Sequence, residues 1–316
     1  MNRTPNILVT GALGQIGSEL IRELVKKYGK NNVLASDIKK PFSQMNGVDF
    51  VQLDCLDSQA VQKTVDSHQI NQIYHLAALL SAVAEANPQK AWKVNMDGLF
   101  NILESAREFN CSVFTPSSIG AFGPSTPPDQ TPQDTIQRPT SIYGVTKVAG
   151  ELLCDYYHKR FGTDTRGVRY PGIISNLTPP GGGTTDYAVD IYYEAVKKGH
   201  YTCFLKPDTN LDMMYMPDAI SAAINLMEAD PDKLFHRNAF NVTAMSFTPE
   251  EIKKSIQKYM PEFSMDYEVD PVRQAIADSW PNSMNDSAAK EEWGWNPGYN
   301  LDTMTRDMLT TLKKRL

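Results

Sequence analysis

The feature that most constrains this chain is a regular alternation of short apolar runs and helical stretches over its first 175 residues. Short runs of apolar and β-branched residues predict strands, and apolar residues at helical spacing predict helices between them. The predicted strands are Ile7–Thr10, Val33–Asp37, Phe50–Asp54, Ile73–Ala78, Ser112–Ser117 and Arg166–Tyr170. The predicted helices are Gln15–Tyr28, Ser58–His68, Pro88–Phe109 and Tyr143–Phe161. Such a succession predicts an α/β fold, with parallel strands joined by right-handed crossovers and covered on both faces.

A glycine-rich turn lies directly after the first predicted strand and opens the first predicted helix. Its glycines are Gly11, Gly14 and Gly17, in the spacing Gly-x-x-Gly-x-x-Gly. Small residues let the backbone approach a pyrophosphate, and the helix N-terminus offers free N–H groups and the positive end of its dipole. A glycine trio alone is also typical of a tight turn without a ligand, but the strand–turn–helix context favours a dinucleotide site.

The ends of the next strands predict the rest of this cofactor site. Asp37 ends the second predicted strand, where a carboxylate would accept hydrogen bonds from the adenosine ribose. The same charge would repel a 2′-phosphate, which favours NAD over NADP, although Lys39 and Lys40 follow closely and weaken this preference. We expect cofactor contacts at Gly11, Gly14, Gln15, Ile16, Gly17, Asp37, Asp54, Cys55, Leu56, His75, Leu76, Ala77 and Ala78.

The charge balance and the cysteine pattern disfavour several other classes of protein. The 31 basic and 37 acidic side chains give a net charge of −6, which argues against nucleic acid or an anionic membrane as the main partner. No apolar run reaches the roughly 18 residues of a membrane span, and the first predicted strand begins too early to leave room for a signal peptide. The four scattered cysteines predict buried thiols of a cytoplasmic protein rather than a disulfide or zinc framework, and no metal site is predicted.

A tyrosine and a lysine four residues apart, Tyr143 and Lys147, form a candidate general base. Residues i and i+4 share one face of a helix, and a fixed ammonium favours the phenolate of a tyrosine, whose reference pKa is about 10. Ser118 follows the fifth predicted strand, at the edge where open parallel sheets bind their ligands, and can donate a hydrogen bond to a substrate oxygen. Tyr-x-x-x-Lys is common by chance and serine often caps a strand end, so the hypothesis depends on the combination with the glycine turn.

In combination, these elements resemble the extended short-chain dehydrogenase/reductase family. The matching residues are Gly11–Gly17, Asp37, Asp54, His75–Ala78, Asn95, Ser118, Tyr143, Lys147 and Arg169–Pro171. The resemblance implies a Rossmann-like doubly wound parallel sheet with Tyr143 as the acid/base. It implies Lys147 as the electrostatic partner of Tyr143 and the anchor of the nicotinamide ribose, and Ser118 as a ligand of the substrate hydroxyl. It also implies cofactor contacts at Asn95, Tyr143, Lys147, Tyr170 and Ile173.

The alternation becomes less regular after Pro171. The Gly/Pro/Thr stretch 178–185 predicts a long loop, and Thr248, Pro249 and Glu251 predict a capped helix start. We expect an NAD-binding Rossmann domain over residues 1–175, with segments near 212–243 returning to it. Residues 176–211 and 244–316 are expected to form a smaller, interleaved C-terminal substrate-binding domain.

Several runs in both halves are similar to the short-chain type of L-threonine 3-dehydrogenase. They are Ser117–Gly123, Tyr170–Ile174, Gly181–Tyr187, Met213–Asp218, Ile276–Pro281 and Trp293–Trp295. This resemblance implies NAD-dependent oxidation of the L-threonine hydroxyl to 2-amino-3-oxobutyrate, a step of threonine catabolism. The substrate contacts that it implies are Ser81, Ser118, Tyr143, Gly183, Thr184, Thr185 and Trp280.

The same family resemblance implies a homodimer built from the helices Pro88–Phe109 and Tyr143–Phe161. Alternatives stay open for three of these features. The apolar faces of the two helices are equally consistent with internal core, Trp280 with packing, and the loop 181–185 with a hinge that makes no ligand contact.

Two other functions compete with this hypothesis. A nucleotide-sugar epimerase or dehydratase must hold a diphosphate, usually with arginine, but Arg237 is the one arginine between Pro171 and Pro271. A dehydratase would also need an acidic residue beside the active-site serine, whereas Ile119 and Gly120 follow it. A non-catalytic NAD-binding sensor would often have lost the tyrosine or the lysine, and both are present here.

Overall fold

The computed structural model describes residues 4–41, 47–179 and 183–316, which form two compact units. Unit 1 contains Met1–Ser118, Ser141–Arg169 and Ile220–Phe240, and unit 2 contains Ile119–Thr140, Tyr170–Ala219 and Asn241–Leu316. The predicted domains differ from this grouping in residues 119–140 and 170–175, and at the edges of the returning segment, in residues 212–219 and 241–243. The assignment of cofactor binding and substrate binding to separate domains stays a prediction.

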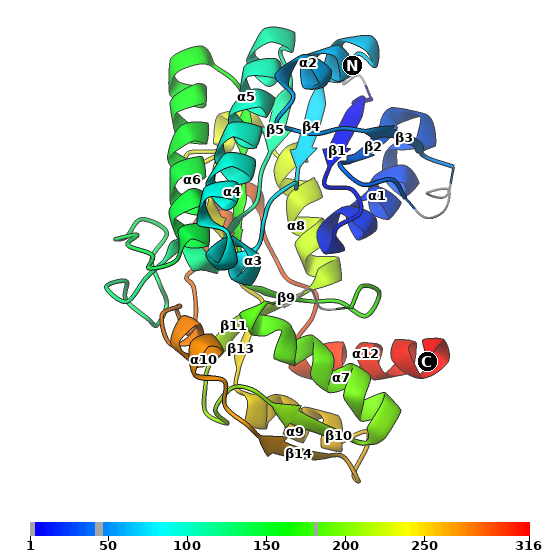
Figure 1. The fold of residues 1–316 in the computed structure, drawn as a ribbon, viewed down its shortest axis with the longest axis vertical. Helices are drawn as coiled ribbons and strands as arrows, with labels where there is room; N and C mark the ends of the chain where they lie inside the picture. Colours follow the sequence, from blue (N-terminus) through cyan, green and yellow to red (C-terminus); the bar gives the residue numbers. More distant parts are fainter. Residues whose placement is uncertain (1–3, 42–46, 180–182) are drawn as a thin grey trace. The chain divides into compact units, whose positions relative to one another are not determined.

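The main sheet of unit 1 has six parallel strands in the order β3-β2-β1-β4-β5-β7 (Figure 1). Their bounds are β1 Ile7–Thr10, β2 Val33–Asp37, β3 Asp49–Gln52, β4 Gln72–His75, β5 Ser112–Phe114 and β7 Thr165–Arg166. The central strand β1 pairs with β2 on one side and β4 on the other, so that Thr10 lies beside both Ser36 and His75. This arrangement confirms the predicted α/β, Rossmann-like fold.

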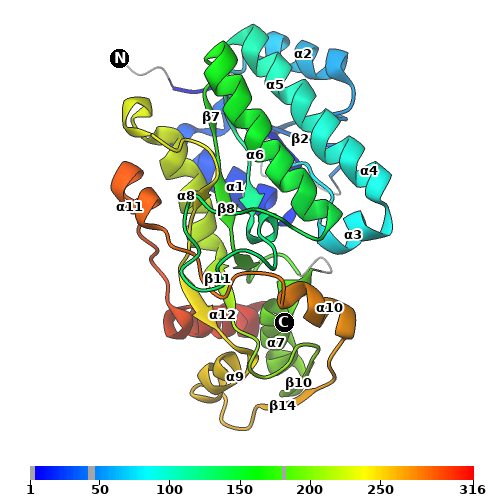
Figure 2. The same cartoon turned by 90° about the vertical axis from the view of Figure 1, so that its left-hand side faces the viewer.

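Helices cover both faces of this sheet because its strands are apolar on both sides. The helices α2 (Ser58–Ser67), α5 (Gly98–Phe109) and α6 (Ile142–Phe161) pack side by side over one face (Figure 2). Leu8 of β1 belongs to the buried cluster that these helices form, whereas its neighbours in the strand point to the opposite face. There α1 (Gln15–Tyr28) packs against β1 and β2.

Several predicted strands are shorter or divided in the structure, and the predicted strand Phe50–Asp54 corresponds to β3, which ends at Gln52. The predicted strand Ser112–Ser117 is broken into β5 and β6 (Ser117–Ser118), since Pro116 between them has no N–H to donate to a ladder. The predicted strand Arg166–Tyr170 is divided at Gly167 into β7 and β8 (Val168–Tyr170). The predicted strand Ile73–Ala78 is wrong at its end, because β4 stops at His75.

The predicted helix Pro88–Phe109 is also interrupted. It consists of α4 (Pro88–Trp92), a π-helical turn over Lys93–Asp97 and α5. By contrast, the helix predicted over Tyr143–Phe161 starts one residue earlier, at Ile142, because Ser141 caps it by accepting a hydrogen bond from Gly144 N at 3.0 Å.

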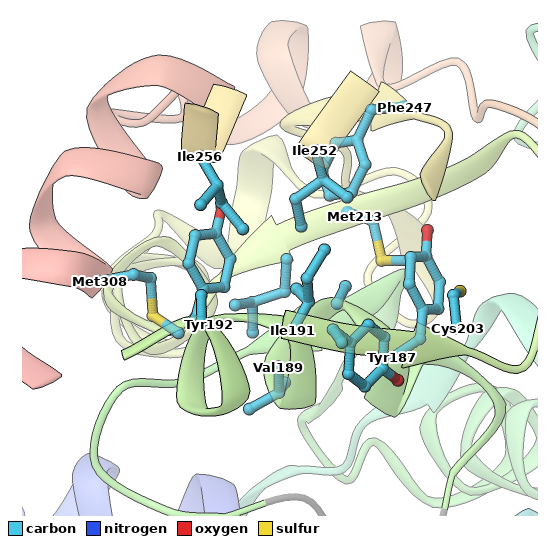
Figure 3. Close-up of a cluster of buried hydrophobic side chains, with 14 of the residues drawn as sticks. Tyr187, Val189, Ile191, Tyr192, Cys203, Met213, Phe247, Ile252, Ile256 and Met308 are labelled. Carbon is cyan, nitrogen blue, oxygen red and sulfur yellow. The ribbon is translucent and has the colours of Figure 1, made fainter. Parts of the chain in front are cut away.

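Unit 2 has its own core, in which tyrosines of α7 (Tyr187–Lys198) take the central place (Figure 3). Tyr187 and Tyr192 are fully buried among apolar side chains of α9 and α12, and the Tyr192 hydroxyl lies 2.7 Å from Thr305 Oγ1. The predicted helix start at Thr248 is confirmed, because Thr248 and Glu251 form a reciprocal capping box.

The other elements mostly belong to unit 2. Two sheets of unit 2 have the orders β13-β11-β9 and β10-β14, and a third sheet has the order β12-β8-β6. The bounds are α3 Ser81–Ala86, β9 Gly172–Ile174, β10 His200–Cys203, β11 Leu211–Tyr215, α8 Met216–Glu228, β12 Phe240–Asn241, β13 Met245–Phe247, α9 Pro249–Gln257, β14 Ser264–Tyr267, α10 Pro271–Ala277, α11 Ser287–Trp293 and α12 Leu301–Arg315.

All four cysteines are buried and unpaired, which confirms the prediction of free thiols. Across the described ranges, no helix combines the length and the apolar character that crossing a membrane requires.

Candidate functional site

The glycine turn after β1 leaves no room for side chains. Gly11 has a φ of +68°, and a Cβ there would lie 2.7 Å from the backbone nitrogen of Ala77. A Cβ on Gly17 would lie 2.4 Å from the carbonyl oxygen of Gly11, so both positions require glycine. Gly14 is the N-cap of α1 and provides no side-chain cap, and the first turn has no acidic residue. The N–H groups at this helix start are therefore available to an anion.

Two polar side chains beside this turn fit a dinucleotide. The Gln15 side-chain nitrogen is buried and has no hydrogen-bond partner among the residues that the structure describes, as expected for a donor that would bind a phosphate. Asp37 Oδ2 accepts a hydrogen bond from Leu13 N at 3.1 Å, and its Oδ1 accepts one from Lys39 N at 3.0 Å. These hydrogen bonds fix the carboxylate at the end of β2. Its remaining lone pairs can accept hydrogen bonds from ribose hydroxyls.

The residues predicted to follow the third strand lie in a loop after β3. Asp54 Oδ1 accepts a hydrogen bond from Leu56 N at 2.9 Å, which shapes this loop. Cys55 is buried beside them, and burial raises the pKa of its thiol to about 11. The three residues thus form a turn at the same edge of the sheet as Asp37, since strands β2 and β3 are parallel.

A buried histidine ends β4. His75 Nδ1 lies 2.8 Å from Thr10 Oγ1, and burial, with a smaller contribution from the charge of Lys147, lowers the pKa of His75 to about 3. The imidazole is therefore neutral at physiological pH. His75 lines a cavity of about 40 Å³ within unit 1. The other residues of its wall are Leu76, Ala77, Ala78, Asn95, Leu99, Thr115, Pro116, Ser117, Thr146, Lys147, Gly150, Glu151 and Asn238.

Asn95 lies in the π-helical turn and links three segments. Its Oδ1 accepts a hydrogen bond from Leu79 N at 2.8 Å, and its Nδ2 donates to Leu79 O and to Thr146 Oγ1, each at 3.1 Å. The chain after β4 is thereby fixed to α6. Single π-helical turns often occur at functional sites, where they aim one side chain. A direct contact of Asn95 with the cofactor stays a prediction.

The predicted base and its partner lie together on α6. Lys147 Nζ is 5.5 Å from the centroid of the Tyr143 ring and donates a hydrogen bond to Pro116 O at 2.7 Å. The Tyr143 ring is 8% exposed and packs against Ala84 and Ala91. This packing and the lysine hydrogen bond hold the two side chains in place, with the ammonium beside the ring of Tyr143.

The two predicted serines of unit 1 belong to elements that pack on α6. Ser118 is the last residue of β6, and Ser81 is the buried first residue of α3. The structure therefore brings Ser81, Ser118, Tyr143 and Lys147 to one region of unit 1. A hydrogen-bond donor, a phenol and an ammonium in this region can deprotonate and orient an alcohol.

The remaining predicted residues belong to unit 2. Thr184 and Thr185 form a 3₁₀ turn with Asp186, whose Oδ2 accepts a hydrogen bond from Gly183 N at 2.5 Å. Gly181 and Gly182, which the predicted loop includes, lie outside the described residues. The contacts of Gly183, Thr184 and Thr185 with a substrate stay predictions.

Three further residues of unit 2 have packing roles in the structure. Trp280 packs against the buried cluster of Ile119, Phe122 and Met284, in line with the packing alternative. The Tyr170 hydroxyl donates to Ala219 O at 2.5 Å, and burial raises its pKa far above the usual range. Ile173 of β9 lies beside Met214 in β11. The ligand contacts of Trp280, Tyr170 and Ile173 also stay predictions.

Glu151 is a residue beside the site that the sequence analysis missed, and its partner Arg169 was named there only within the matching run Arg169–Pro171. Glu151 lies one turn after Lys147 and two turns after Tyr143, on the same face of α6, and it lines the cavity described above. Its carboxylate forms an ion pair with Arg169 in which both side chains are buried. The signal in the sequence was an acidic residue at helical spacing on the buried face of the helix.

Known proteins resemble this chain over nearly its whole length. Residues 7–243 match the NAD dependent epimerase/dehydratase family. An uncharacterized epimerase/dehydratase of Staphylococcus haemolyticus is 57% identical over 311 residues, covering 98% of each chain. The structure of L-threonine dehydrogenase from Clostridium difficile is 56% identical, with a TM-score of 0.98 and 99% of each chain covered. The holo form of an L-threonine dehydrogenase from Cupriavidus necator is 52% identical, with a TM-score of 0.95, and the match covers 98% of this chain and 100% of that one.

Proposed function

Because the chain belongs to the NAD-dependent epimerase/dehydratase family, of the extended short-chain dehydrogenase/reductase type, we propose that it is an L-threonine 3-dehydrogenase. Membership of this family makes it an enzyme with a nicotinamide cofactor. The finer assignment is the oxidation of the L-threonine hydroxyl by NAD to 2-amino-3-oxobutyrate, in threonine catabolism. The main support for this assignment is the similarity to the L-threonine dehydrogenase from Clostridium difficile, which is 56% identical over 99% of this chain.

In the proposed reaction, the side chains of unit 1 handle the proton. Tyr143, as the phenolate, takes the proton of the substrate hydroxyl, and Lys147 stabilises the negative phenolate by its nearby charge. Ser118 donates a hydrogen bond to the same substrate oxygen and orients it. A bound NAD would supply the acceptor for the hydride that leaves the carbon carrying this oxygen. The products are the ketone, NADH and one proton, which balances the oxidation.

The groups proposed for the charged ends of threonine come mainly from unit 2. Gly183, Thr184 and Thr185 offer N–H groups and hydroxyls, which suit a carboxylate. Ser81 and Trp280 are proposed to complete the substrate contacts. We place the activity in the cytoplasm, where four buried free thiols stay reduced.

A substrate panel tests this proposal. The purified protein is incubated with NAD and, in turn, L-threonine, D-threonine, other small secondary alcohols and uridine or thymidine diphosphate sugars, while NADH absorbance and sugar products are followed. We expect NADH formation with L-threonine. Turnover of another alcohol, or conversion of a nucleotide sugar, without activity on L-threonine would reject the assignment.

We propose that Asp37 selects NAD over NADP. Replacing Asp37 by alanine removes the charge that would repel a 2′-phosphate. We expect Asp37→Ala to reduce the ratio of kcat/KM for NAD to kcat/KM for NADP by roughly tenfold or more. A tenfold change corresponds to a loss of about 1.4 kcal/mol of discrimination between the two cofactors. The measurement is steady-state kinetics with both cofactors. Asp57→Ala, which removes a carboxylate that caps α2, is the control. An unchanged ratio in Asp37→Ala would show that this carboxylate does not read the ribose.

We also propose a homodimer through the outer faces of the segment Pro88–Phe109, which contains α4 and α5, and of α6. Large apolar side chains are exposed there at helical spacing: Trp92 and Phe100 along α4 and α5, and Val145, Leu152 and Tyr156 along α6. Leu152 is 64% exposed and Tyr156 is 53% exposed, which is unusual for a stripe of this length on a monomer. A second copy of the same face would bury both stripes as a symmetric four-helix contact.

Placing a charge in this stripe should separate the dimer. Leu152→Glu buries one carboxylate per subunit at the proposed contact, so we expect a shift from dimer to monomer in light-scattering mass at micromolar concentration. Phe235→Glu changes another exposed apolar side chain, which is 84% exposed and belongs to neither helix, and it should keep the dimer mass. A wild-type protein that is monomeric in this measurement would reject the dimer.

A further inference from the structure

Glu151 is a buried carboxylate on the same helix as the proposed base Tyr143. Its Oε2 accepts a hydrogen bond from Arg169 Nη2 at 2.9 Å, and its Oε1 accepts from Arg169 Nε at 3.1 Å and also from the Ser117 hydroxyl. The Glu151 backbone oxygen accepts from Asn238 Nδ2 at 2.9 Å. The side chains of Glu151 and Arg169 are 6% and 7% exposed, so the carboxylate is buried, and both of its oxygens accept hydrogen bonds from Arg169.

This arrangement is not explained by stability. A buried ion pair loses the hydration of both charges, and well-packed apolar residues of the same volume are often as stable or more stable. The pair lines the cavity beside Lys147 and reaches, through Ser117, the short strand that also contains the proposed substrate ligand Ser118. The ion pair therefore lies beside the proposed catalytic residues Lys147 and Ser118.

Two hydrogen bonds connect successive turns of α6 to this strand. Lys147 Nζ donates to Pro116 O, and the Ser117 hydroxyl donates to Glu151 Oε1. Adjacent side chains of a strand point to opposite faces. The hydrogen bond from Ser117 to Glu151 therefore fixes the backbone of β6, and the Ser118 side chain extends from this backbone on its other face. Two adjacent anchors leave this backbone little freedom to move relative to α6, which also contains Tyr143.

We infer that Glu151, held by Arg169, is a positioning residue that acts through Ser117 to set the Ser118 hydroxyl against the oxygen that Tyr143 deprotonates. The inference rests on the proposed function, because it assigns Ser118 to the substrate. A displacement of about 1 Å in a reacting group can reduce a rate by about 10²-fold, so a small loosening of β6 is enough to lower turnover.

A double-mutant cycle tests this inference without removing the ion pair. Ser117→Ala deletes only the hydroxyl that bonds Glu151, and we expect kcat to fall by roughly 10- to 100-fold while the dissociation constant of NAD stays unchanged. In a Ser118→Ala background, the same change should lower kcat by less than about twofold, because the group that it positions is already absent. The matched control is Ser105→Ala on α5, whose buried hydroxyl has no hydrogen-bond partner among the described residues, and which should keep the wild-type kcat.

The outcomes separate the two claims. Wild-type protein that oxidises no alcohol with NAD contradicts the proposed function and, with it, this inference. Wild-type activity with equal losses from Ser117→Ala in both backgrounds would show that Ser117 acts independently of Ser118, and would overturn the inference alone. A Ser117→Ala variant as active as Ser105→Ala would overturn it as well. Thermal melting of each variant distinguishes lost positioning from lost folding.

Discussion

Tyr143→Phe should reduce kcat by about 10²- to 10⁴-fold, which is the usual contribution of a positioned general base. The variant lacks only the phenol oxygen, and its ring keeps the packing against Ala84 and Ala91. Lys147 keeps its hydrogen bond to Pro116 O, so the proposed ribose contact is retained. We therefore expect NAD affinity, measured by fluorescence titration, to change less than about threefold while NADH formation nearly stops.

A second tyrosine of the same helix provides the control. Tyr156 is 53% exposed on the outer face of α6, and Tyr156→Phe also removes one phenol oxygen. Its kcat should equal that of the wild type. If Tyr143→Phe turned over at a comparable rate as well, Tyr143 would have no part in the proton transfer.

Arg169→Leu should cause the largest loss of stability. The change leaves the buried Glu151 carboxylate without its counter-charge, and breaking a buried pair in this way typically costs about 3–5 kcal/mol of unfolding free energy. The loss would be visible as a shift of the urea unfolding midpoint. The double variant Glu151→Leu with Arg169→Leu has no buried charge, so it should be more stable than Arg169→Leu alone.

An exposed ion pair gives the comparison for this effect. Lys26 lies 2.5 Å from Glu23, and both side chains are largely exposed, so Lys26→Ala should change the midpoint far less. A double variant less stable than Arg169→Leu would contradict the desolvation argument. It would mean that the polar contacts of Glu151 with Ser117 outweigh the burial of its charge.

The central part of the fold was predictable because its strands are short apolar runs with clear ends. Ile7–Thr10 and Val33–Asp37 have the same bounds in the sequence analysis and in the structure. Predictions failed where a single residue interrupts a run: Pro116 ends a ladder, and Gly167 divides another strand. The π-helical turn was not predictable from helical spacing, since Asn95 is fixed there by Leu79 and by Thr146 on a different helix.

The candidate site shows the same limit. The glycine turn and the Tyr143–Lys147 pair are local patterns, so the sequence indicates them directly. The ion pair joins Glu151 of α6 to Arg169 of β8. Ser117, which donates a hydrogen bond to the same carboxylate, lies 34 residues before Glu151. Such pairs depend on tertiary packing, and local periodicity indicates only that Glu151 shares the buried face of its helix.

The most direct test of the proposed function follows the hydride. The protein is incubated with NAD and L-threonine deuterated at the carbon that carries the hydroxyl, and the reduced dinucleotide and the amino-acid product are analysed by mass spectrometry. The proposal predicts one deuterium in each NADH formed and one equivalent of 2-amino-3-oxobutyrate or its decarboxylation product. An absence of labelled NADH, with L-threonine recovered unchanged, would contradict it.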